Sequence, residues 1–104
     1  IGGRVGDIVG RKLWGLAAAG GHQVIIVTHL PQLAGYGDAH LRVSKEVGGG
    51  RTTTQIENLD RDGRINELAA MLGTGHETAV NGAHSILVNV QAVKGSLPES
   101  QVVR

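Results

Sequence analysis

The chain has 104 residues, of which 40% are hydrophobic, but only one Trp, one Tyr and no Phe, which predicts one domain or a piece of one with an aliphatic core. The net charge of +1 gives no electrostatic case for a nucleic-acid surface, and the lack of cysteine excludes a disulfide framework, a zinc–thiolate site and thiol catalysis. No apolar run approaches the ~18 residues of a membrane span and no signal peptide is recognised, so we expect a cytoplasmic protein without membrane partners.

The first predicted helix follows Gly2-Gly3 and ends at Gly20-Gly21. Its apolar residues recur at helical spacing and predict one apolar face, formed by Val5, Ile8, Val9, Leu13, Leu16 and Ala17. Trp14 falls nearly opposite the centre of that face. It is either a surface residue or a contact with protein outside these residues, and the sequence does not favour one of the two.

The next element, Val24–Val27, consists of four β-branched residues without alternation. This pattern predicts a strand buried on both faces, as in the parallel sheet of an α/β protein. Ligands of such sheets bind beyond the carboxyl ends of the strands, and Thr28 and His29 stand at that end. A lone histidine is more often structural than catalytic, but this position favours function. Because a parallel strand needs neighbours, either its partners lie outside these residues, one of them just before Ile1, or the strand assignment is wrong.

Turn residues delimit the remaining elements. Pro31 predicts a short helix to about Gly35, and Gly48–Gly50 predict the turn of an antiparallel hairpin between Leu41 and Leu59. A phosphate-binding role for these glycines is disfavoured because no Lys-Ser/Thr pair follows them. Two further helices are predicted, from Asp60 or Asp62 to Gly73 and from Thr74 to Gly95. The chain is thus divided into a segment 1–95 and a loose C-terminal tail, 96–104.

Few constellations of reactive side chains are present. The five histidines lack both the i, i+4 helical pair of zinc proteases and cysteine neighbours, so no metal site is predicted. The serines lack the glycine elbow of a nucleophile. His29 is therefore the one candidate catalytic group, and the other parts of its site must come from elsewhere.

The stretch Val27–Ala34, with Thr-His-Leu-Pro-Gln at its centre, closely resembles the switch-histidine segment of the RecN family of bacterial DNA repair ATPases, which are related to SMC and ABC proteins. Other blocks resemble the same family in order and spacing, namely Ile1–Arg4 with Val9-Gly10, Val43–Lys45, Gly50–Thr54 and Glu67–Gly73. The resemblance covers roughly residues 1 to 90, and the stretch from Val88 onward departs from it.

The resemblance implies the C-terminal part of a P-loop NTPase head of the ABC/SMC type, with a buried parallel strand, flanking helices and an antiparallel hairpin. In such heads two ATP molecules with Mg lie between two subunits. His29 would be the catalytic switch histidine at the γ-phosphate, with Thr28 and Gln32 beside the nucleotide. Gly2 and Gly3 would border the D-loop, which crosses to the partner's site.

Further expectations follow from the same resemblance. The partners would be the rest of the head, a second copy across the ATP-sandwiched interface and, through the intact protein, DNA at double-strand breaks, which implies a nucleoid-associated location. Walker A, Walker B and the signature motif are absent from the chain, so ATP and Mg would be bound mainly by upstream residues. The intact parent would be an ATP hydrolase, and the segment should be inactive alone.

Two alternatives remain. The chain could come from another SMC/ABC-type ATPase, which the continuation Leu30-Pro31-Gln32 disfavours. It could also be a non-enzymatic protein-interaction module that binds a partner through its hairpin and the Trp14 face. A Walker A motif in the parent would separate this last reading from the ATPase.

Overall fold

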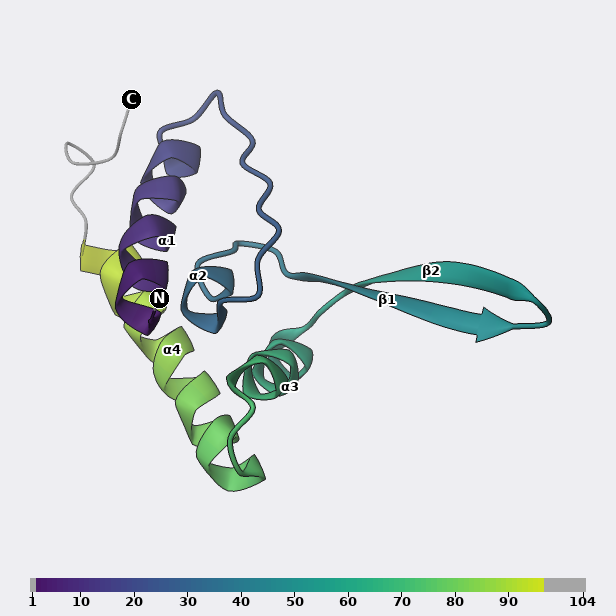
Figure 1. Cartoon of the computed structure of the whole chain (residues 1–104). Coiled ribbons are helices and arrows are strands. Elements are labelled where there is room, and N and C mark those ends of the chain that lie inside the picture. The colour runs from purple at the N-terminus through teal and green to yellow at the C-terminus, as the bar shows by residue number, and fades with distance from the viewer. Residues whose placement is uncertain (1, 97–104) are drawn as a thin grey trace.

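The computed structural model describes residues 2–96 as a mixed arrangement of helices and strands (Figure 1). In chain order the elements are α1 (Gly3–Ala18), α2 (Pro31–Ala34), β1 (Leu41–Gly48), β2 (Arg51–Asn58), α3 (Arg61–Leu72) and α4 (His76–Ser96). All the predicted helices and the hairpin are present close to their predicted bounds. Ser96, assigned to the tail by prediction, is the last residue of α4, and the rest of the predicted tail, 97–104, lies outside the described residues.

The hydrophobic core lies between α3 and α4. Of the two predicted caps, Asp60 begins α3, because its side chain accepts a hydrogen bond from the Gly63 amide at 2.8 Å. Gly73 ends the helix in the left-handed conformation, as predicted. After α3 the chain turns back, so that α4 packs along α3. The buried residues of this interface are Ile65, Leu68, Ala69, Ala79, Ala83 and Leu87. Small alanines on α4 facing larger residues on α3 let the two helices approach closely.

Helix α1 packs through a face that the sequence did not predict. Its buried residues are Gly6, Gly10 and Gly15. Of the predicted apolar face, Val5, Ile8 and Val9 are exposed and Leu13, Leu16 and Ala17 are half-buried. An apolar helix face usually meets the core. Here the bare backbone of Gly6 and Gly10 accepts α2 and the residues after it, and the first turns of the apolar face stay exposed.

The predicted buried parallel strand is also absent from the described residues. Residues 22–28 have no regular backbone pairing, and Ile25 and Val27 are 81% and 98% exposed. In Figure 1 this stretch runs as an extended connection from the end of α1 to α2. The physical reason is that a β-strand requires a partner, and within residues 2–96 the two strands of the hairpin pair only with each other.

The hairpin projects away from the helices (Figure 1). Its antiparallel register places Val43 opposite Ile56 and Gly48 opposite Arg51, and every residue in both strands is exposed. Its base is joined to the body by the Leu59 amide, which donates to the His40 carbonyl at 2.9 Å. A two-stranded sheet without packing on either face is only marginally stable in water.

None of the described helices is long and apolar enough to cross a membrane.

Candidate functional site

His29 is held in solvent by a local turn. The Leu30 amide donates to Thr28 Oγ1 at 3.0 Å, which closes a short side-chain turn around the histidine. Thr28 and Leu30 are half-buried, whereas His29 is exposed. The turn therefore anchors the residues on either side of the imidazole and leaves the ring itself available to a ligand.

The helix that follows the turn is fixed by Pro31. This buried proline is the first residue of α2, where its missing amide proton costs nothing, and Leu30 precedes it in an extended conformation. The Leu30 carbonyl accepts from the amides of Leu33 and Ala34 at 3.1 and 2.9 Å. The Thr-His-Leu-Pro pattern thus produces an exposed histidine two residues before the start of a short, well-anchored helix.

The structure brings Gln32 and Gly3 together. A β-carbon at residue 3 would come within 2.6 Å of Gln32 Nε2 and 2.7 Å of its Cδ, so the glutamine side chain lies directly on the glycine backbone at the start of α1. The next turn of α1 meets the same helix, because Gly6 lies beside Gln32 Cβ and the Leu33 amide. Gly2 has open space around it. Of the five predicted site residues, Thr28 and His29 share one turn and Gln32 and Gly3 share one contact.

The Asp7 carboxylate of α1 binds Tyr36, which lies two residues after the end of α2. Tyr36 is 3% exposed, and its hydroxyl donates to Asp7 Oδ1 at 2.7 Å. The same carboxylate accepts from Asn89 of α4 at 3.1 Å and forms an ion pair with Arg11 at 3.1 Å. Burial raises the pKa of Tyr36, and the hydrogen bond to Asp7 raises it further, so the phenol stays neutral as a donor. Helices α1 and α4 are thereby joined to the end of α2.

The role of Trp14 is resolved within the chain. Its indole Nε1 donates to Asp38 Oδ1 at 3.2 Å, and Lys94 of α4 donates to the same oxygen at 2.9 Å. The Lys94 ammonium lies 5.4 Å from the centre of the indole ring, within the range of a cation–π contact. Trp14 thus links α1 to α4 through contacts within the chain.

The described residues offer an imidazole contact but not a metal centre. Within residues 2–96 no group of three His, Cys, Asp or Glu side chains is placed to hold a metal ion. The Thr28 hydroxyl oxygen already accepts a backbone proton. The arrangement fits a single exposed ring that contacts a ligand held mainly by other residues.

Sequence reasoning missed a second polar centre, around Arg64. Its guanidinium donates from Nη2 to the carbonyls of Gly35 and Gly37 at 3.2 and 2.9 Å, and so binds the end of α2 from α3. Its buried Nε has no partner among the described residues. Burial lowers the pKa of Arg64. No sequence motif indicates the role of Arg64, because its partners lie 27 and 29 positions away in the chain.

Comparison with known proteins finds several relatives that are DNA repair proteins named RecN. The chain is 50% identical over 76 residues to the DNA repair protein RecN of Xylella fastidiosa (strain Temecula1), 40% over 90 residues to that of Vibrio cholerae, and 42% over 85 residues to that of Mycobacterium leprae. These matches cover 73%, 85% and 82% of the chain but only 13%, 16% and 14% of the relatives, so the chain spans about a seventh of their length. No family model matches the chain.

Proposed function

The chain belongs to the RecN family of DNA repair proteins, corresponding to a C-terminal part of them, and on that premise we propose that it supplies the switch histidine of an ATP site used in DNA double-strand break repair. His29 is the residue assigned to the γ-phosphate. Walker A, Walker B and the signature motif are assigned to residues beyond these 104. In this proposal the chain is part of an ATPase head and is inactive by itself.

The contact between Gln32 and Gly3 carries the proposal. It sets the helix that follows the histidine against the start of α1, which in the proposal borders the D-loop. The segment that would carry the switch histidine and the segment that would lead from the D-loop to the partner's nucleotide are therefore adjacent in one chain. A displacement at the start of α1 would be transmitted through Gln32 to the turn that carries His29.

The exposed stretch before the histidine supports the same assignment. Ile25, Ile26 and Val27 are all exposed, although each side chain contributes roughly 1.5–3 kcal/mol when fully buried. In the proposed head this stretch becomes a strand between strands formed by other residues, with both faces covered. The exposed apolar face of α1, with Val5 and Ile8, packs against the same remainder of the head.

In this proposal the chain contributes only a few side-chain contacts to ATP hydrolysis. ATP with Mg supplies the phosphoryl group and the cation that neutralises its developing charge, and catalysis of such transfers rests on positioning and charge stabilisation. A ring N–H of His29 would donate to a γ-phosphate oxygen, or its lone pair would accept from the attacking water. Thr28 fixes the turn that orients the ring. Gln32 holds the turn against α1 and lies beside the nucleotide.

The proposed partners follow from this division of the site. The rest of the head completes the nucleotide pocket, and a second head closes it across the D-loop. DNA binds the assembled protein, which places the function at the nucleoid. The non-enzymatic alternative keeps one observation, the hairpin with both faces exposed, but loses its second feature because Trp14 is bonded to Asp38 within the chain.

The test is ATP hydrolysis by a head that contains this chain together with its Walker motifs. His29→Ala should abolish most of the turnover. His22→Ala is the matched control, because His22 is an exposed histidine at the other end of the same extended stretch. Equal turnover in the wild type and His29→Ala would reject the assignment, and a parent protein without a Walker A motif would favour the interaction module.

A further inference from the structure

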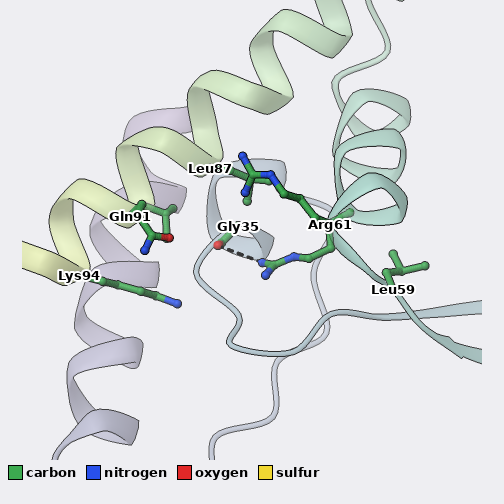
Figure 2. Close-up of a pocket in the computed structure, with 8 residues that line it drawn as sticks. Gly35, Leu59, Arg61, Leu87, Gln91 and Lys94 are labelled. Carbon is green, nitrogen blue, oxygen red and sulfur yellow. Dashed lines mark hydrogen bonds between the residues drawn. The ribbon is translucent and has the colours of Figure 1, made fainter.

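A basic pocket lies on the face of α3 and α4 near Gly35. It encloses a cavity of about 250 Å³, and its lining includes Gly35, Arg61, Arg64, Leu87, Gln91 and Lys94. Figure 2 shows Arg61 reaching from α3 toward α4, with Gln91 and Lys94 on the facing helix. Apolar side chains such as Leu87 share the lining with three cationic side chains and the Gln91 amide, so the pocket favours an acceptor-rich ligand.

The two arginines form no ion pair with a carboxylate in the part of the chain that the structure describes. Among residues 2–96 neither Arg61 nor Arg64 has an acidic oxygen within 4.0 Å, whereas Arg11, Arg42 and Lys94 do. Arg64 donates to neutral carbonyls and keeps a buried Nε without a partner. Burial lowers the pKa of Arg64, the Asp38 carboxylate raises it, and the like charge of Arg61 lowers it by a smaller amount, so some repulsion between the two arginines remains. An anion between them would relieve that repulsion.

Lys94 adds a third positive charge, which is already paired with a carboxylate. Its side chain is 19% exposed, and its ammonium is paired with Asp38 at 2.9 Å. Asp38 is itself largely exposed and also accepts from Trp14. A ligand in the pocket would share Lys94 with this carboxylate, so Asp38 opposes anion binding. Removing its charge is therefore expected to strengthen binding, an effect that a purely structural role of the cluster does not produce.

We propose that this pocket binds a phosphate group, with Arg61 and Arg64 as the guanidinium contacts and Gln91 and Lys94 as further donors. The planar guanidinium matches the oxygens of a phosphate and is weakly hydrated, which suits a partly enclosed site. The phosphate is either a free phosphate ion or a phosphodiester of the DNA backbone. The site is separate from His29 and does not depend on the histidine's role.

Titration of the 104-residue chain at constant ionic strength tests the proposal, with inorganic phosphate in one arm and a short double-stranded oligonucleotide in the other. Arg61→Gln should weaken binding about tenfold, because a charged hydrogen bond is lost. Arg51→Gln removes the same charge at the base of the hairpin turn, away from the pocket, and should change binding little. Asp38→Asn should tighten binding. Circular dichroism of each variant confirms that the helices are retained.

The two arms identify the source of the phosphate. Pocket-dependent binding of inorganic phosphate assigns a free phosphate, and pocket-dependent binding of the oligonucleotide alone assigns the DNA backbone. Either result supports the site. The proposal is overturned if the wild type binds neither probe saturably, or if Arg61→Gln and Arg51→Gln weaken binding equally, since the latter is a general effect of charge. Neither outcome bears on ATP hydrolysis.

Discussion

The ring of Tyr36 lies against the bare backbone of Gly10, where a β-carbon would stand 3.0 Å from the ring Cγ and 3.2 Å from Cε2. Together with the hydrogen bond from Tyr36 to Asp7, this contact fixes the end of α2 on the middle of α1. The candidate site depends on it, because the turn that carries His29 leads directly into α2. The glycine face of α1 is thus the support of the site.

Gly10→Ala should weaken this support. The new methyl group would overlap a ring that is 3% exposed and has little room to move, which costs about 1–3 kcal/mol, partly offset by the ~1 kcal/mol that alanine gains over glycine in a helix. Gly15→Ala is the control, since no atom lies within 4 Å of its β-carbon position. Urea denaturation should show lower stability for the first variant and equal or higher stability for the second. A shift of the same sign in both would contradict the contact.

Tyr36→Phe should lower the free energy of unfolding by about 1 kcal/mol at neutral pH, the usual net value of one hydrogen bond. The pH dependence gives a second check. Because the folded pKa of Tyr36 is raised above its ordinary 10.0, the stability it contributes is complete below pH 10 and is lost as the pH rises through the folded value. The difference between the wild type and Tyr36→Phe should therefore shrink above pH 10, and a constant difference would disprove the linkage.

His40 should make the fold sensitive to acid. Burial lowers its pKa, and the positive charge of Arg64 lowers it further, while Glu67 partly opposes the shift. A depressed folded pKa gives stability that is complete above the ordinary value of 6.5 and lost as the pH falls through the folded value. Denaturation between pH 7 and pH 5 should show a smaller decline in His40→Leu than in the wild type. His22→Leu, at an exposed site, serves as the control and should leave the decline unchanged.

Val27→Asp separates the chain alone from the chain in its proposed setting. Val27 is 98% exposed, so in the 104-residue chain the substitution should change stability by no more than ~0.5 kcal/mol. In a complete head the same carboxylate would be buried in a sheet, with a cost of several kcal/mol and loss of soluble protein. Thermal denaturation of both forms measures the difference. Tolerance of the aspartate in the complete head would show that the stretch is not a buried strand.

The sequence predicted the elements better than their packing. Local signals such as Pro31, the glycine turn of the hairpin, the Asp60 cap and the Gly73 stop were read correctly because each acts within a few residues. The buried strand and the apolar face of α1 could not be placed in the same way. Both require partners, and a partner is a property of the surrounding protein and not of the local pattern.

The candidate site was predicted in part. The sequence predicted the short helix that follows His29, and the structure adds the exposure of His29 and the contact between Gln32 and Gly3. The pocket at Arg64 was not foreseen. Its donors come from α3 and α4, and no spacing along the sequence relates Arg61 to Lys94. Such a site becomes visible only when the helices are packed.

The central claim is that His29 acts at the γ-phosphate of an ATP site, and the kcat for ATP hydrolysis by the complete head tests it most directly. For His29→Ala we expect kcat to fall on the order of 10²-fold, with nucleotide affinity changed much less, as for the loss of one positioned contact to a developing charge. The His22→Ala control should keep the wild-type kcat. A wild-type kcat in His29→Ala, with the protein folded and nucleotide bound, would contradict the account.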